Sequence, residues 1–184
     1  GGRSALSHSG ALEAVDECWR SHGQGNAINL IGSSFGGWAA AAYAARHPER
    51  VHRLLLLCPG FALADRWEAI VGGPEQMAHW EAAGSRTFTI PASGKPVGIP
   101  WSFAASCRDF PATPQPGCPT TIVHGEHDET VPWQGSEAFV AQASASRRLI
   151  LLDDDHALTL PSTLCSILEA AQTTFDLVEV NSEG

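Results

Sequence analysis

Gly32-Ser33-Ser34-Phe35-Gly36 is the most informative stretch of this 184-residue chain. The pentapeptide has the form G-x-S-x-G and stands between an apolar run at residues 27–31 and an alanine-rich run at residues 38–46. Where a strand turns sharply into a helix, the serine at the turn is exposed, and the flanking glycines let the chain pass where a Cβ would clash. The context predicts that Ser34 is a nucleophile, although glycine and serine are also common in plain turns.

A serine hydroxyl needs a neighbouring base to act as a nucleophile, and the downstream sequence offers one. Asp128 follows a strand-like run at residues 120–123, and His156 follows an apolar run at residues 149–152. The order Ser34, Asp128, His156, with separations of 94 and 28 residues, differs from that of several other serine triads. The pattern predicts that His156 is the general base and that Asp128 orients it. Other acids stay open for the orienting role: Glu126, Glu129 and Asp153 to Asp155.

Taken together, these motifs resemble the α/β-hydrolase superfamily, and most closely its small cytoplasmic serine esterases with a G-S-S-x-G-G elbow. The resemblance runs from Gly1 to about Thr174 and includes the segments His47 to Val51 and Gly125 to Pro132. It implies an α/β fold with a mostly parallel sheet, flanking helices and a small cap insertion. It also implies hydrolysis of a small carboxylic ester through an acyl-enzyme, with the backbone amide of Phe35 in the oxyanion hole.

The beginning of the chain predicts that part of this fold lies upstream. Gly1 to Ser4 resembles the loop after the fourth strand of the hydrolase fold. We therefore expect the earlier strands, and the H-G-x loop that carries the second oxyanion donor, to belong to a longer protein. Usual domain sizes suggest roughly 60 to 90 further residues.

The remaining sequence predicts helices that alternate with buried strands around one insertion. Three apolar patterns with helical spacing indicate helices, at residues 11–20 with Ser9 as the N-cap, 133–146 and 161–175. A continuously apolar run at residues 54–57 indicates a buried strand, and residues 147–152, which end in the apolar run 149–152, indicate another strand. We expect four segments: hydrolase core at 1–59, a cap or lid at 60–118, hydrolase core at 119–175 and a loose tail at 176–184.

The cap is predicted from its composition. It is rich in proline, shows only short helical patterns near residues 64–70 and 75–82, and contains Trp67, Trp80 and Trp101. Large aromatic side chains on a lid can give a substrate pocket its area and shape. The three tryptophans are therefore candidate substrate-binding residues, with a small core internal to the cap as the alternative.

Composition excludes several other classes of protein. The chain is 43% hydrophobic and 17% charged, with a net charge of −9 and no basic cluster, so we expect no nucleic-acid partner. We expect no membrane partner, because no apolar run approaches the roughly 18 residues that cross a bilayer, and no secretory leader opens the chain. The expected partner is a small-molecule ester, and the sequence carries no signal for an oligomeric state.

The cysteines and histidines give no sign of a disulfide framework or a metal site. Five cysteines, an odd number without C-x-x-C spacing, indicate reduced thiols and a cytoplasmic location. His124 and His127 are three residues apart, but they flank the predicted acid loop. We therefore expect no metal and no other cofactor.

Two alternatives to ester hydrolysis stay open. The same triad can hydrolyse a thioester or an amide, or cleave a carbon–carbon bond. A non-catalytic binding protein with the hydrolase fold is the second alternative. Such a protein would usually have lost one of the three triad residues, and this chain has all three.

Overall fold

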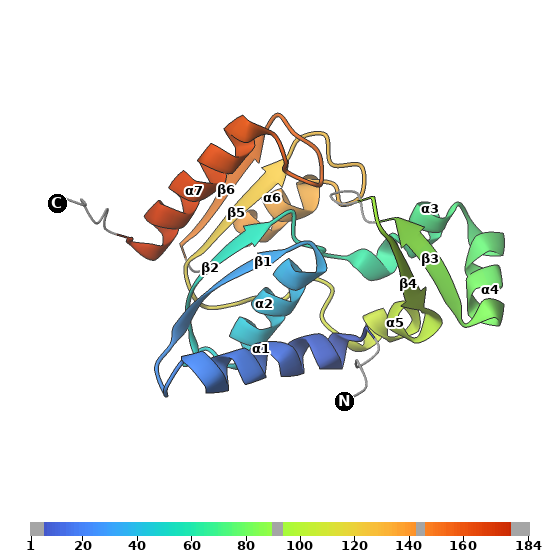
Figure 1. Cartoon of the computed structure of the whole chain (residues 1–184), viewed down its shortest axis with the longest axis horizontal. Helices are drawn as coiled ribbons and strands as arrows, with labels where there is room; N and C mark the ends of the chain where they lie inside the picture. The colour runs from blue at the N-terminus through green and yellow to red at the C-terminus, as the bar shows by residue number, and fades with distance from the viewer. Residues whose placement is uncertain (1–5, 90–93, 143–145, 178–184) are drawn as a thin grey trace.

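The structure is a computed structural model that describes residues 6–89, 94–142 and 146–177. Four parallel strands form the central sheet, in the order β1-β2-β5-β6 (Figure 1). Their bounds are Ile28–Ser33, Val51–Leu57, Thr120–Gly125 and Arg147–Leu152. Parallel neighbours need crossover connections, and helices supply them between consecutive strands.

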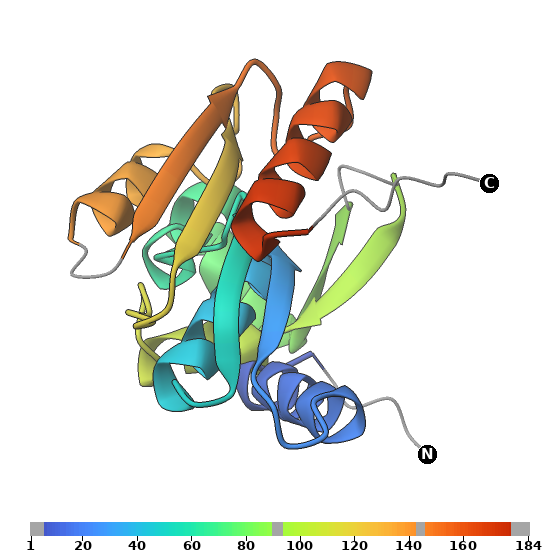
Figure 2. The same ribbon diagram turned by 90° about the vertical axis from the view of Figure 1, so that its left-hand side faces the viewer.

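Four helices pack around this sheet: α1 (His8–His22), α2 (Phe35–Arg46), α6 (Gln134–Ala141) and α7 (Pro161–Phe175). Helices α2 and α6 cover one face of the sheet and α7 covers the other (Figure 2). Every residue of α2 from Gly37 to Ala44 is buried, because its small side chains let the helix lie close to the strands. The predicted mostly parallel sheet flanked by helices is confirmed.

The predicted helices and strands differ from the observed ones mainly at their ends. The strand at Arg147–Leu152 and the helix at Pro161–Phe175 have the predicted bounds. Helix α1 begins before the predicted start, and its N-cap is Ser7, whose side chain accepts a hydrogen bond from the amide of Gly10 at 3.0 Å. Ser9 lies inside the helix, so its prediction as the N-cap was wrong. Helix α6 ends at Ala141, and residues 143–145 lie outside the described residues.

The segment between β2 and β5 stands beside the sheet (Figure 1). It contains α3 (Trp67–Val71), α4 (Pro74–Ala83), the hairpin strands β3 (Ser85–Thr89) and β4 (Pro96–Pro100), α5 (Trp101–Ser106), and 3-10 turns at Leu63–Asp65 and Cys107–Asp109. We call this segment, residues 60–118, the cap. The helical patterns predicted near residues 64–70 and 75–82 correspond to α3 and α4, whereas the sequence did not predict α5 or the antiparallel hairpin. The four predicted segment boundaries stay a prediction.

Three hydrophobic clusters stabilise the described chain. The largest lies between the sheet and helices α1, α2 and α6, and a second lies beneath α7. The third, around Trp67, Trp80 and Phe103, belongs to the cap. The cap therefore has a core of its own, beside the two that stabilise the sheet.

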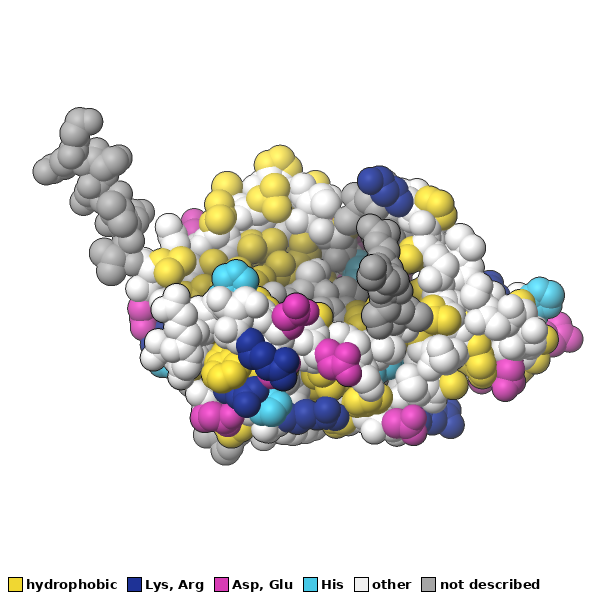
Figure 3. All heavy atoms as spheres, turned by 60° about the horizontal axis from the view of Figure 1, so that its bottom comes forward, with side chains coloured by type: hydrophobic (Ala, Val, Ile, Leu, Met, Phe, Trp, Pro, Cys, Tyr) yellow, Lys and Arg dark blue, Asp and Glu magenta, His cyan; other side chains and the backbone are white. Residues whose placement is uncertain are grey.

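One edge of the described sheet is apolar. Strand β1 lies at that edge, and Ile31 is 57% exposed. Hydrophobic side chains also gather in a hollow on one face of the molecule (Figure 3). Among the described helices, none is long and apolar enough to cross a membrane.

Candidate active site

Ser34 occupies a strained turn between β1 and α2. Its φ of 52° and ψ of −122° are unusual for a residue with a side chain, and such conformations cost on the order of 1–3 kcal/mol. Its amide donates to the carbonyl of Leu57 at 2.8 Å, and its carbonyl accepts from the amides of Gly37, Trp38 and Gly60 at 2.9, 3.2 and 2.8 Å. These four backbone bonds hold the turn in place and leave the hydroxyl to point away from the sheet's backbone.

The glycines of the pentapeptide have different roles. A Cβ at Gly32 would lie 2.8 Å from the carbonyl carbon of Gly36 and from the Cα of Gly37, so the turn requires glycine there. A Cβ at Gly36 would meet nothing within 4 Å. The prediction that both flanking glycines avoid a clash is therefore wrong for Gly36. It is the backbone of Gly36 that a Cβ at Gly32 would meet.

The structure brings Ser34, His156 and Asp128 together. Nε2 of His156 lies 3.0 Å from Oγ of Ser34, and Nδ1 of His156 lies 2.6 Å from Oδ2 of Asp128. The side chain of His156 is 14% exposed and that of Asp128 is 0% exposed. Asp128 follows β5 and His156 follows β6, and parallel strands end at the same edge of the sheet. The geometry allows a proton to pass from the serine to the imidazole.

The other acids that the sequence left open contact different groups. Asp153 lies 2.7 Å from His127 at the surface. Asp154 accepts from the amide of Asp155 at 2.8 Å, and Asp155 accepts from the amide of Ala157 at 2.8 Å. These aspartates shape the loop before the histidine instead of contacting its ring, and the two remaining acids are exposed: Glu126 and Glu129.

The carboxylate of Asp128 is held in its charged form. Burial alone would raise the pKa of Asp128, but hydrogen bonds from His124, His156 and the amide of Val131 outweigh it and hold this pKa well below its ordinary value. The other oxygen, Oδ1, accepts from the amides of Thr130 and Val131 at 2.9 and 2.7 Å. A charged and fixed carboxylate can orient the His156 ring and stabilise its cation.

Phe35 follows the serine and begins α2, where a helix leaves its first amides without an intrahelical partner. Its ring packs against His8, Trp38 and Phe103, with centroids 5.1, 5.5 and 4.8 Å away. His8, to which the sequence gave no role, is buried here, and burial lowers its pKa. The ring contacts fix Phe35 at the start of α2, and the oxyanion role of its amide stays a prediction.

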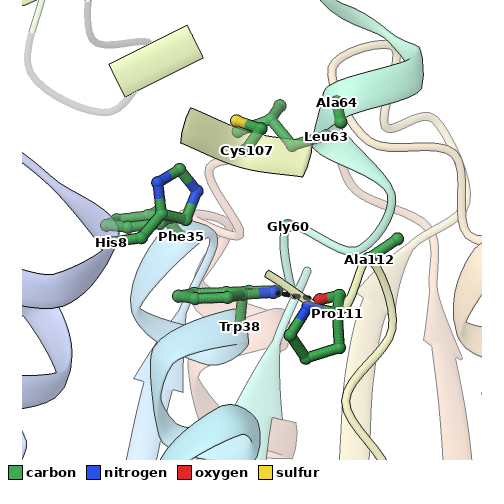
Figure 4. A pocket seen from close by; sticks show the side chains of 9 residues that line it. All are labelled: His8, Phe35, Trp38, Gly60, Leu63, Ala64, Cys107, Pro111 and Ala112. Carbon is green, nitrogen blue, oxygen red and sulfur yellow. Dashed lines mark hydrogen bonds between the residues drawn. The ribbon is translucent and has the colours of Figure 1, made fainter. Parts of the chain in front are cut away.

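Two cavities border Phe35, and they differ in the size of the molecule that each can hold. The smaller, of about 10 Å³, lies beside Trp38, whose indole N–H donates to the carbonyl of Pro111 at 2.9 Å (Figure 4). Such a volume suits about one water molecule. The larger, of about 480 Å³, is lined by Ser34 and His156 and falls within the usual range of ligand pockets, about 300–1,000 Å³. The larger cavity is therefore the one of a size that suits a small-molecule ligand.

The cap supplies most of the apolar lining of this larger cavity. Of the three candidate tryptophans, Trp67 lines it. Trp80 is buried in the cap, where its indole N–H donates to the carbonyl of Ile99 at 3.0 Å and its ring contacts Trp101. Six other lining residues of the cap were missed by the sequence analysis, because they lie on segments too short to show a clear apolar period. They are Phe88, Val97 and Ile99 on the hairpin strands, and Leu63, Ile70 and Phe103 on short helical segments.

Among the described residues, one group of three histidine, cysteine and acidic side chains is compact enough to hold a metal ion, and it includes Asp128. Ligand atoms of Cys58, His124 and Asp128 lie within 4.8 Å of one another. Burial raises the pKa of the Cys58 thiol to about 12, whereas a metal binds the thiolate. His124 and Asp128 already bond each other, and His127 pairs with Asp153 at the surface. We assign no metal to this group.

Comparison with known proteins gives one consistent fold. A family model described as the alpha/beta hydrolase fold matches residues 8–81. Palmitoyl-protein thioesterase ABHD10, mitochondrial, of Mus musculus is 32% identical over 114 residues, which are 58% of this chain and 37% of the mouse protein. The match thus spans well under half the length of that curated relative.

Solved structures agree with this assignment of the fold. The alpha/beta hydrolase domain-containing protein 10 from mouse is similar with a TM-score of 0.74 and 24% identity, covering 96% of this chain and 72% of that one. The monoacylglycerol lipase of Paleococcus ferrophilus is similar with a TM-score of 0.74 and 14% identity, covering 96% and 78%. This chain therefore has the α/β-hydrolase fold.

Proposed function

We propose that this chain is the catalytic part of a serine hydrolase that cleaves carboxylic esters through an acyl-enzyme. The observation that carries the proposal is the hydrogen-bonded series Ser34, His156, Asp128 at the wall of an apolar cavity. The three residue types have distinct tasks in acyl transfer, and the distances suit those tasks. The substrate is a small molecule, and no cofactor is needed.

The reaction divides into two similar halves. Oγ of Ser34 attacks the ester carbonyl while Nε2 of His156 takes its proton, and Asp128 stabilises the resulting imidazolium. The amide of Phe35 donates to the negative oxygen of the tetrahedral intermediate. His156 then gives its proton to the departing alcohol. A water molecule attacks the acyl-serine in the second half, with His156 again as the base.

A thioester of a longer acyl chain is the second candidate substrate. The cavity beside Ser34 is lined mainly by hydrophobic residues of the cap and has a volume of about 480 Å³, which exceeds the need of a short acyl group such as acetyl. The mouse relative is named a palmitoyl-protein thioesterase. The triad chemistry is unchanged, since only the leaving group differs.

Substitution of the serine in the full-length protein tests the proposal. Ser34→Ala should abolish hydrolysis of p-nitrophenyl esters and fluorophosphonate labelling, because triad deletions cost on the order of a millionfold in other serine hydrolases. Ser166→Ala is the control, since this serine lies on α7 and bonds within its own helix. Retained turnover in Ser34→Ala would show that the elbow is not catalytic. Turnover rates for acetyl and octanoyl oxygen esters and thioesters then separate the two substrate candidates.

We also propose a cytoplasmic location, which is supported by the cysteines. Cys18, Cys58, Cys107, Cys118 and Cys165 are all free thiols, as is usual in a reducing compartment. The mouse relative is named as mitochondrial. Fractionation of cells that express the tagged full-length protein distinguishes the two compartments.

A further inference from the structure

His124 is a buried histidine that the proposed reaction does not use. It lies on β5, between β2 and β6 in the sheet, and its side chain is 0% exposed. Nε2 lies 3.1 Å from Oδ2 of Asp128 and 2.8 Å from the carbonyl oxygen of Val131. Nδ1 lies 2.9 Å from the hydroxyl of Ser136. Both ring nitrogens thus have partners.

These partners determine where the hydrogen of the ring lies. A carboxylate and a carbonyl can only accept, so Nε2 must donate to Asp128 and Val131. With the hydrogen on Nε2, Nδ1 is an acceptor, and the hydroxyl of Ser136 can donate to it. The remaining titratable group of the cluster, Cys58, stays a neutral thiol because burial raises its pKa to about 12. His124 therefore presents a fixed N–H to one charged neighbour, Asp128.

The carboxylate of Asp128 needs such a donor on its second oxygen. The amides of Thr130 and Val131 fix Oδ1, while Oδ2 receives N–H groups from His124 and His156. The terminal torsion of an aspartate is soft, so one fixed oxygen does not set the plane of the group. His156 gains and loses a proton during the proposed reaction, whereas His124 keeps the same partners throughout.

We propose that His124 is a positioning residue, which holds Oδ2 of Asp128 at the place where Nδ1–H of His156 meets it. This inference rests on the function proposed above. His124 acts through Asp128, and its task is to keep the plane of the carboxylate fixed while His156 changes charge. Because the site is closed to solvent at this point, no bulk water replaces the N–H when it is removed.

Removal of the N–H should slow the chemical step and leave binding nearly unchanged. Loss of one hydrogen bond to a buried charge is expected to lower kcat about tenfold to a hundredfold, with little change in KM. Without His124, Oδ2 would accept a hydrogen bond from His156 but no longer from a second ring. Its negative charge would therefore stabilise the cation of His156 more strongly. The acid limb of kcat/KM against pH should consequently move to higher pH.

Two polar substitutions separate this role from a merely structural one. The amide of His124→Gln can place an N–H near the position of Nε2, beside Asp128. The shorter amide of His124→Asn reaches only the position of Nδ1, beside Ser136. Both variants would be made in the full-length protein and assayed on a p-nitrophenyl ester, with folding followed by thermal melting. His127→Asn is the matched control, since it alters a surface histidine of the same loop that pairs with Asp153.

We expect His124→Asn to have a lower kcat and an acid limb that lies at higher pH. His124→Gln should be close to wild type in kcat and in the position of the acid limb, and His127→Asn should be unaffected. Equal rates and equal acid limbs in folded Gln and Asn variants would overturn the inference, as would a wild-type rate in His124→Asn. Fluorophosphonate labelling of Ser34 in the wild-type protein is measured in parallel. Absence of that labelling would refute the proposed function itself, whereas labelling together with equal Gln and Asn variants would refute only the role of His124.

Discussion

The substitution Gly125→Ala tests whether the position of His156 is set by the backbone beneath it. Gly125 ends β5, and a Cβ there would lie 2.5 Å from the carbonyl oxygen of Asp154 and closer still to that of Asp155. Ordinary contact begins at 3.4 Å, so relief of the closer of these two contacts would require the loop to move by about 1 Å. His156 is the next residue in that loop, and its Nε2 lies 3.0 Å from Oγ of Ser34. The shift would break this hydrogen bond.

We expect about a hundredfold loss of kcat, because a displacement of about 1 Å at a catalytic group costs that much. Overpacking should also lower the free energy of unfolding by about 1–3 kcal/mol. Initial rates on a p-nitrophenyl ester and urea unfolding measure the two effects. Gly135→Ala is the control, since a Cβ at Gly135 would meet nothing within 4 Å. If Gly125→Ala kept wild-type kcat and stability, the tight contact between the two loops would be refuted.

Two further predictions concern the acid and the cap. The pKa of Asp128 lies below its ordinary value of 3.8 in the folded protein, so its charge stabilises the fold above about pH 4, and this contribution is lost as the pH falls through the lower, folded value. The difference in unfolding free energy between wild type and Asp128→Asn should therefore shrink below pH 4 in urea titrations, and a constant difference would contradict the depressed pKa. Trp80→Ala should lower the free energy of unfolding by about 3–5 kcal/mol, because this ring is buried in the cap, whereas Trp67→Ala should also change the ratio of rates on acetyl and octanoyl esters. An unchanged ratio in Trp67→Ala would argue that the ring only packs the cap.

The sequence predicted the parts of the site that depend on local order. Ser34, Asp128 and His156 each follow an apolar strand, and the ends of parallel strands share one edge of the sheet, so order along the chain indicates proximity in space. The strand at residues 147–152 and the helix at 161–175 were equally predictable, because the strand ends in the apolar run 149–152 before three aspartates and the helix begins at a proline.

What the sequence could not predict depends on contacts between distant segments. The cap hairpin has strands of only five residues with a proline at each end of β4, so no apolar period is long enough to identify it. The role of His124 is equally hidden, because it follows from where Ser136 and Val131 lie and not from their sequence spacing. Ser7 and Ser9 are both possible N-caps in the sequence, and only the structure shows that Ser7 has the extended backbone and the side-chain hydrogen bond of the cap.

The cap and the acid loop share contacts that join pocket shape to catalysis. The guanidinium of Arg66, at the start of α3, donates to the carbonyls of Thr130 and Glu129 at 3.1 and 3.4 Å. The amide of Thr130 in turn donates to Oδ1 of Asp128 at 2.9 Å. The residues that line the apolar cavity and those that fix the carboxylate are therefore linked through one loop. We therefore expect a substitution of Arg66 to alter the position of Asp128, so its effect on kcat has to be measured apart from any effect on substrate preference.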